Sequence, residues 1–383
     1  MLPRSTASQP LPDAGALRRT FDRADALTIG LEEEVMLLDP ETLDLAPAAP
    51  AVLGRLDAPE RFKPELPLSQ LEIVTAPHES AADAAAELAT GRRELIAATE
   101  RLALPAAAGT HPFADPLGEL NPTARYGGIR KEYASVARLQ LVSSLQVHVA
   151  VGGAERSLAV YNALRSHLPE LAALATNAPL LAGLDTRLAS VRPKLAELLP
   201  RQGVPPTLSS WDEYAEAIAW GARCGAFDGP RHWWWELRPH PGFGTLEVRV
   251  CDAQSGLAEV GAVAAVVQAL VAWLAAGHDA GDLPAPAPAW RIEQNRWSAC
   301  RHGVSGTLAD LRTGRPQSTR ARLERLFDQI GPAAARLGVG DGLDHARRML
   351  EQPGYERQRR AFQAGPAAVA TSLVDRYREG LAT

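Results

Sequence analysis

Three consecutive glutamates, Glu32 to Glu34, lie at the centre of a stretch rich in apolar residues, residues 27–39, with the sequence LTIGLEEEVMLLD. Alternate side chains of a strand share a face, so we expect Glu32 and Glu34 on one face and Glu33 on the opposite, apolar one. Neighbouring like charges repel, most strongly at low dielectric, and a divalent metal would compensate them most directly. For Glu32 and Glu34 the alternative is a solvated acidic strand edge. For Glu33 the alternative is a buried ion pair with an arginine.

Other apolar segments also contain a single carboxylate or imidazole. Glu72 lies in LEIVT, Glu247 in TLEVRV and His148 in LQVHVAV, while Glu65 lies seven residues before Glu72, beyond a proline. His148, Glu72 and Glu247 taken singly are each more often hydrogen-bonded core residues than ligands, and that alternative stays open for each. If their faces converge, the result is an oxygen-rich pocket with one nitrogen donor. Such a pocket suits Mg²⁺ or Mn²⁺ bridged to nucleotide phosphates.

Arginines near these acids could bind phosphate. Arg238 lies in ELRPHP, and Arg249 lies two residues beyond Glu247. Guanidinium groups match the geometry of carboxylates and phosphates and could neutralise charge during phosphoryl transfer. The alternative is structural pairing with strand acids. Arg296 and Arg301, in NRWSACR, are weaker candidates because an arginine on a helix surface is ordinarily solvated.

The glycine-rich phosphate motifs GxxxxGK[ST] and GxGxxG are absent, as are GxSxG and HExxH. A nucleotide would therefore be held by metals and arginines. Three successive tryptophans at positions 233–235 could stack on a base, but large aromatics in a strand mostly form core, and we favour the core interpretation.

Composition narrows the class of protein. The 383 residues are 46% hydrophobic and 22% charged, as in an ordinary globular protein, and the net charge is −5. Because the chain is mildly acidic and has no basic stripe, it is a poor candidate for binding nucleic acid. Three cysteines without metal-ligand spacing favour a reducing compartment. No run approaches eighteen consecutive apolar residues and the start lacks a signal peptide's apolar middle, so we expect no membrane span and a cytoplasmic location.

The chemistry-bearing residues fall on predicted strands. We expect strands at 27–39, 69–77 and 138–152, and a hairpin within 232–252 that turns at PHPGFG. Helices are expected at 79–101, 154–177 and 211–220, the last with a capping box of Ser210 and Glu213, and through most of the remainder. Strands interspersed with long helices predict an α+β fold with a largely antiparallel sheet. We assign residues 1–14 to a flexible N-terminal tail and residues 15–383 to a single catalytic domain with a mostly helical C-terminal part.

Several segments together resemble a known family. The sequence TIGLEEEVMLLDPETLDLAP is followed in order by PELPLSQLEIVTAP, GTHPFADP, LQVHVAV, WWWELRPHPGFGTLEVRVCDAQ and NRWSACRHG. This series resembles the carboxylate–amine ligase branch of the glutamate–cysteine ligase type 2 family over residues 28–303. The GxEEE strand and the RPHPxFGTLExRxxD segment are its most specific parts.

The resemblance implies a glutamine-synthetase-like fold, whose antiparallel, funnel-shaped catalytic sheet is flanked by helices and holds ATP with two or three Mg²⁺ ions. It implies metal-ligand roles for six residues and phosphate or substrate contact for two arginines, with γ-glutamyl ligation as the prototype reaction. The implied metal ligands are Glu32, Glu34, Glu72, His148, Glu247 and Glu65. Arg249 and Arg238 are the implied catalytic arginines, and Arg296, Arg301 and Gln70 are further candidates for binding substrate or nucleotide.

The chain departs from the family pattern beside these positions. Ser143-Ser144 stands where the family often has Cys-Gly, His78 where it often has cysteine, and Glu236-Leu237 where it usually has Asp-Ile. These differences affect substrate detail, so cysteine is an unsafe choice for the amine.

The expected reaction forms an acyl phosphate from a carboxylate and ATP, and an amine then displaces the phosphate. The loop at 109–115 is a candidate wall that keeps water out. The rival interpretations are a carboxylate or guanidino kinase, a non-catalytic ligand-sensing protein on the same fold, and a metal-dependent hydrolase. The substrates, the general base, the adenine-binding residues and the oligomeric state, with a homodimer as one option, stay open.

Overall fold

A seven-stranded sheet forms the centre of the molecule. The structure is a computed structural model, and it describes residues 11–58, 60–227 and 229–381. Six strands follow the order β2-β3-β1-β5-β9-β8, β4 also pairs with β1, and all these pairs are antiparallel. The antiparallel α+β prediction is therefore confirmed. The strands are β1 (Ile29–Leu38), β2 (Phe62–Pro64), β3 (Gln70–Val74), β4 (Leu104–Ala106), β5 (Ser144–Ala150), β8 (Leu237–His240) and β9 (Thr245–Asp252).

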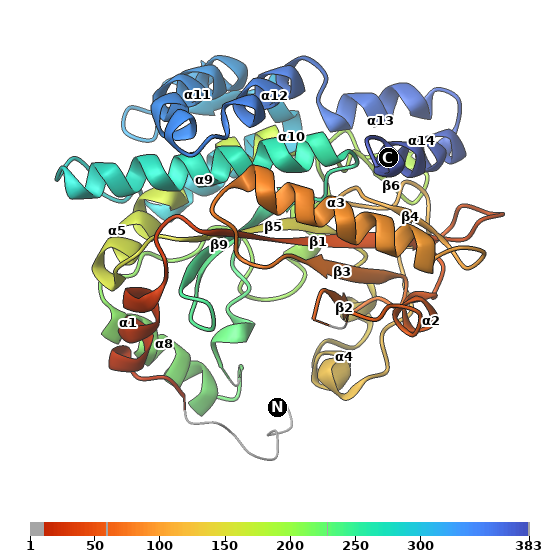
Figure 1. Cartoon of the computed structure of the whole chain (residues 1–383), viewed down its shortest axis with the longest axis horizontal. Helices are drawn as coiled ribbons and strands as arrows, with labels where there is room; N and C mark the ends of the chain where they lie inside the picture. The colour runs from red at the N-terminus through yellow and green to blue at the C-terminus, as the bar shows by residue number, and fades with distance from the viewer. Residues whose placement is uncertain (1–10, 59, 228, 382–383) are drawn as a thin grey trace.

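Helices cover one face of this sheet. In Figure 1, α3 (Ala81–Ala98) and α9 (Leu257–Asp279) run along one side of the sheet, and α11 (Thr319–Arg336) and α12 (Gly340–Glu351) lie beyond them. The other side is flanked at one end by α1 (Ala14–Arg23) and α8 (Trp211–Arg223), and at the other by α2 (Ala49–Leu53) and α4 (Ala124–Arg138). The remaining elements are α5 (Ala154–Leu164), η1 (Arg165–His167), α6 (Leu168–Leu174), β6 (Leu180–Leu181), β7 (Leu184–Asp185), α7 (Arg192–Ala196), η2 (Pro230–His232), α10 (Ala289–His302), η3 (Gly303–Ser305), β10 (Thr307–Ala309), β11 (Pro316–Ser318), α13 (Gly354–Phe362) and α14 (Pro366–Arg378).

The main hydrophobic core lies between the sheet and its helical layer. Leu31 and Val35 of β1, Val147 of β5 and Leu88 of α3 belong to one buried cluster. Helix α9 is long and apolar enough to cross a membrane, yet 78% of its most apolar stretch is buried here, which is also the behaviour of a soluble protein's core helix.

Most predicted elements form close to their expected places. Ser80 begins α3, and its Oγ accepts a hydrogen bond from the Asp83 backbone N–H at 3.2 Å. Ser210 caps α8 in the same way through the Glu213 N–H at 3.1 Å. The Glu213 carboxylate reaches back to the N–H of Ser209, so the capping box is displaced by one residue.

Three predicted elements are shorter than expected. The strand expected at 138–152 is only β5, because residues up to Arg138 belong to α4. The helix expected at 154–177 breaks near Pro169, which sits in the first turn of α6 and lacks a backbone N–H. Residues 233–236 form no strand, since the Glu236 N–H bonds to the Gly203 carbonyl of a loop.

The N-terminal tail predicted at 1–14 falls mainly on residues 1–10, which lie outside the described residues. Helix α1 begins at Ala14, and Asp13 caps it by accepting a hydrogen bond from the Ala16 N–H at 2.6 Å. The division into a tail and one catalytic domain stays a prediction.

Candidate active site

The sheet face opposite α3 and α9 gathers polar side chains from four strands. Residues directly opposed in an antiparallel pair share a face. Glu34 of β1 opposes Glu72 of β3, and His148 of β5 opposes Glu247 of β9. Glu32 lies two residues before Glu34 and therefore on the same face. The predicted convergence of these residues is thus present in the register of the sheet.

Glu32, His148 and Glu247 form the tightest group of possible metal ligands. One ligand atom from each lies within 4.8 Å of the others. His148 Nε2 is 3.4 Å from Glu32 Oε1 and 4.0 Å from Glu247 Oε2. The other ring nitrogen, Nδ1, lies 3.0 Å from Thr245 Oγ1, which orients the imidazole. Nε2 is buried, forms no hydrogen bond among the described residues, and faces the Glu32 carboxylate, so a cation could bind both groups.

Glu247 also holds both predicted catalytic arginines. Arg238 Nε donates to Glu247 Oε2 at 2.5 Å, and Arg249 Nη1 donates to Glu247 Oε1 and to Gln146 Oε1. Burial alone would raise the pKa of Glu247, but Arg238, Arg249 and His148 hold that pKa well below its ordinary value. Each carboxylate oxygen has two lone pairs, so a cation can still bind an ion-paired glutamate.

Arg238 and Arg249 differ in which of their N–H groups form hydrogen bonds within the protein. Arg238 uses Nε for Glu247 and Nη1 for the Arg231 carbonyl. Among the described residues, Arg249 donates side-chain hydrogen bonds only from Nη1. The Nε and Nη2 groups of Arg249 therefore remain available, and its side chain is 22% exposed.

A second group of acids, Glu34, Glu65 and Glu72, is buried together, and the nearby charges of Arg249 and Arg192 at Glu34 and of Arg125 at Glu65 do not offset this burial. Glu34 accepts hydrogen bonds from the Ser144 N–H at 2.6 Å and Gln146 Nε2 at 2.9 Å. Burial, followed by the charge of Glu34, raises the pKa of Glu65 to about 8. Burial and the charges of Glu32, Glu65 and Glu34 raise the pKa of Glu72 well above its ordinary value. This is the electrostatic signature of a place that favours a cation.

The donor chemistry fits divalent magnesium or manganese. Five buried or half-buried carboxylates and one imidazole nitrogen form a mainly oxygen donor set, the preference of these ions. His148 Nε2, which forms no hydrogen bond among the described residues, and the mutual repulsion of the acids both fit a site that binds a cation.

Three further predicted site residues make contacts that do not join these groups. Gln70 lies beside them, but its Nε2 is bound to the Val142 carbonyl and Ser143 Oγ. Arg296 is fully buried and is paired with Glu236, Glu197 and Glu293, whereas Arg301 binds the Arg187 carbonyl. Their ligand-binding roles stay predictions, and we leave both arginines out of the mechanism.

Two residues near the site were missed by the sequence analysis. Gln146 bridges Glu34 and Arg249, and its position on the face of His148 was a usable signal. Arg192 donates from Nε to Asp252 at 2.7 Å and from Nη2 to the Val250 carbonyl at 2.5 Å. Arg192 precedes a proline in a short helix, and nothing in that pattern indicates a place beside the sheet.

The tryptophans separate into different environments. Trp233 is buried in the core, as predicted. Trp234 is half-buried, and its ring lies 5.1 Å from the Arg201 guanidinium and 6.1 Å from the Tyr133 ring. Trp234 is therefore part of a cation–aromatic contact between two segments.

That contact joins α4 to the segment before β8. Near the start of α4, Tyr126 OH donates to the Pro64 carbonyl at 2.6 Å, next to Glu65. Two turns further along α4, Tyr133 OH accepts from Arg201 Nη2 at 3.4 Å. Helix α4 thus connects the β2 edge of the site to the segment that precedes β8.

The loop at 109–115, the wall predicted from sequence, is joined to Ser143 through the backbone. The Ser143 N–H bonds to the Gly109 carbonyl, and the Gly109 N–H bonds to the Asn177 carbonyl. Ala114 and Asp115 line a small cavity with Asp44, Ser69 and Glu119. The role of this loop as a wall stays a prediction.

The fold is shared with solved structures of two ligases. The structure is similar to that of a "Glutamate--Cysteine Ligase" from Francisella tularensis in complex with AMP, with a TM-score of 0.67, 15% identity and coverage of 93% of this chain and 90% of that one. It is also similar to a bifunctional glutathione synthetase from Pasteurella multocida, with a TM-score of 0.61, 13% identity and coverage of 96% and 54%. At these identities the likeness shows a shared fold.

The chain belongs to glutamate-cysteine ligase family 2, whose sequence model matches residues 28–376. A relative from Rubrobacter xylanophilus, named "Putative glutamate--cysteine ligase 2-3", is 36% identical over 346 residues, which are 88% of this chain and 93% of the relative. A relative from Solibacter usitatus, named "Putative glutamate--cysteine ligase 2", is 34% identical over 343 residues, with coverage of 88% and 89%. The resemblance identified from the motifs is confirmed.

Proposed function

We propose that this chain is an ATP- and Mg²⁺-dependent ligase that joins a carboxylic acid to an amine through an acyl phosphate. The observation that carries the proposal is the gathering of five glutamates, the unpartnered His148 Nε2 and two arginines on one sheet face. Family membership and the AMP complex of the Francisella neighbour support nucleotide use. Glutamate, named in the relatives' titles, is our choice for the acid.

Six side chains would hold the divalent ions. Glu32, His148 and Glu247 form one set, and Glu34, Glu72 and Glu65 form the other. Bound Mg²⁺ would neutralise the triphosphate and the charge that grows during phosphoryl transfer. Thr245 keeps the His148 ring turned so that Nε2 faces the acids.

Arg249 would contact the transferring phosphoryl group or the substrate carboxylate. Its Nη1 is anchored to Glu247 and Gln146, which leaves Nε and Nη2 as a preorganised pair of donors. Arg238 donates hydrogen bonds to Glu247 and to the Arg231 carbonyl. It would hold Glu247 in place, and its positive charge would stabilise the transferring phosphoryl group.

The proposed reaction has two steps. A carboxylate oxygen of the acid attacks the γ-phosphorus of ATP, the bond to the β-phosphate oxygen breaks, and ADP and an acyl phosphate form. The amine nitrogen then attacks the acyl carbon, the carbon–oxygen bond to phosphate breaks, and the nitrogen loses a proton to give the amide. Water must be kept from the acyl phosphate, and α4 is the proposed wall.

A screen for ADP release tests the proposal. Purified protein is mixed with ATP, MgCl₂ and amino acids, singly and in pairs, and products are identified by mass spectrometry. We expect ADP, phosphate and an amide in equal amounts for at least one pair that contains glutamate. A phosphorylated acid without an amide would favour a kinase. No binding of ATP with Mg²⁺ by calorimetry would favour a non-catalytic sensor and contradict the proposal.

A further inference from the structure

A single buried guanidinium lies behind the proposed metal site. Arg92 of α3 is fully buried and forms two hydrogen bonds with Glu33, one of them from Nε to Oε2 at 2.9 Å. Glu33 is also fully buried and lies between Glu32 and Glu34 in β1, on the opposite face. The alternative raised from sequence, a buried glutamate paired with an arginine, is therefore confirmed for Glu33.

Arg92 also binds the chain where it leaves β9. Its Nη1 donates to the Ser255 carbonyl at 3.2 Å, and its Nη2 donates to the Gln254 carbonyl at 3.1 Å. Nη1 also contacts the Tyr377 carbonyl of α14 at 3.4 Å, and the guanidinium lies 4.1 Å from the centre of the Tyr377 ring. All five N–H groups of the guanidinium are thus used.

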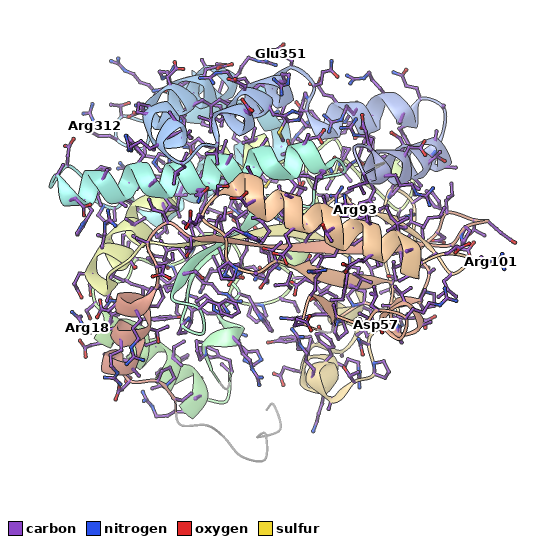
Figure 2. All side chains as sticks on the ribbon, viewed as in Figure 1. Arg18, Asp57, Arg93, Arg101, Arg312 and Glu351 are labelled. Atoms are coloured by element: carbon purple, nitrogen blue, oxygen red, sulfur yellow. The ribbon has the colours of Figure 1, made fainter. Side chains whose placement is uncertain are left out.

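Arg92 is buried because it lies on the side of α3 that packs against the sheet. The neighbouring Arg93 is exposed and is labelled on the surface in Figure 2. On the buried side, Gly91 allows α3 to approach the sheet, because a Cβ there would lie 2.7 Å from Ile73 Cγ2 of β3. The close approach brings the guanidinium within reach of both β1 and the end of β9.

We propose that Arg92 is a positioning residue, which fixes the spacing of β1 and β9 and thereby the separation of Glu32 and Glu247. This inference rests on the proposed function, in which those two residues share a cation with His148. Strand β5 lies between β1 and β9, so a change in that spacing moves the three ligand atoms relative to one another. A lysine keeps the charge, but with three donors it cannot replace five fixed ones.

The test compares Arg92→Lys with wild type in Mn²⁺ binding, measured from the EPR signal of free Mn²⁺ without turnover. We expect the Kd for Mn²⁺ to rise about tenfold, with the far-UV circular dichroism unchanged. The matched control is Arg322→Lys, which alters another arginine paired with a buried glutamate, Glu170, between α11 and α6. That control should lose stability and keep the wild-type Kd.

An Arg92→Lys protein with the wild-type Kd would overturn the positioning role. If Arg92→Lys does not fold, Glu33→Gln, which keeps the shape and removes the charge, replaces it with the same expected direction and the same criterion. If wild type itself binds no Mn²⁺, the proposed function fails as well, so the two failures are distinguished by the wild-type measurement.

Discussion

The Nε2 atom of His148 lies 3.4 Å from Oε1 of Glu32, is buried, and has no hydrogen-bond partner among the described residues. An unpartnered buried imidazole nitrogen costs free energy unless something binds it. In the proposed function a divalent cation binds there, and this relationship gives the first prediction.

Replacing His148 with asparagine should weaken metal binding and leave the fold intact. We expect the Mg²⁺ concentration needed for half-maximal thermal stabilisation to rise roughly 10- to 100-fold, because a ligand is lost. The control is His111→Asn, because both ring nitrogens of His111 have protein partners, the Leu43 carbonyl and the Ala114 N–H. A His148 variant that responds to Mg²⁺ like wild type would remove this residue from the ligand set.

Replacing Glu72 with glutamine should stabilise the metal-free protein while abolishing ligation. Burial and the charges of Glu32, Glu65 and Glu34 raise the pKa of Glu72, so a neutral isostere relieves the repulsion. We expect a gain of roughly 0.5–2 kcal/mol in the free energy of unfolding, measured in EDTA at pH 8. Glu170→Gln is the control and should destabilise, since Glu170 is paired with Arg322. Destabilisation of both variants alike would contradict the account.

Replacing Arg249 with lysine should lower kcat roughly 10- to 100-fold, because the charge remains but the two free donors of the guanidinium are lost. Steady-state ADP and amide assays measure the effect. Unchanged turnover would mean that Arg249 has only a structural role in holding Glu247.

Loss of the contact between α4 and the segment before β8 should expose the acyl phosphate to water. In Arg201→Ala the links to Tyr133, Trp234 and the His232 carbonyl disappear, so more ADP than amide should form. The ratio of the two products is the measurement, and Arg320→Ala, which removes an arginine paired with the exposed Glu351, serves as the control. A ratio of one in both variants would exclude α4 as the wall.

Stability should fall on acidification through His111. Burial lowers the pKa of His111 to about 4, below the ordinary 6.5 of the unfolded chain. Below pH 6.5 the unfolded state binds a proton at His111 that the folded state does not bind. The stability of the folded state is therefore unaffected by His111 above about pH 7 and decreases as the pH falls toward 4. The expected loss from this residue is about 2 kcal/mol at pH 5. Denaturant unfolding of wild type and His111→Asn should show it, and parallel pH curves would contradict it.

The sequence was sufficient to locate the strands that carry the acids, β1, β3, β5 and β9, because their patterns are local, but it did not predict the short strands β2 and β4. Residues 27–39 alternate around Glu32 and Glu34, and that period alone places both acids on one face of β1. The helix expected at 79–101 forms as α3, since its composition and the Ser80 cap agree. The partner of Glu33 could be anticipated as an arginine but not identified, because Arg92 is distant in sequence and is brought near only by packing.

Tertiary contacts determine the features that the sequence did not predict. Helix α4 was not predicted, because its start contains a Gly-Gly pair, which disfavours a helix. The structure also interrupts this helix at Ala134, where φ is 45°. Arg192 and Arg201 carry no local pattern that separates them from surface arginines. Arg296 was considered for ligand binding, yet it is enclosed by Glu236, Glu197 and Glu293, which only the fold brings together.

The most direct measurement is a crystal structure with Mn²⁺ and a non-hydrolysable ATP analogue, in which anomalous scattering locates the metal. We expect Mn²⁺ within coordination distance of Glu32, Glu247 and His148 Nε2, with a second ion among Glu34, Glu72 and Glu65 and the triphosphate next to Arg249. Anomalous peaks elsewhere, with these side chains bound only to one another, would contradict this expectation.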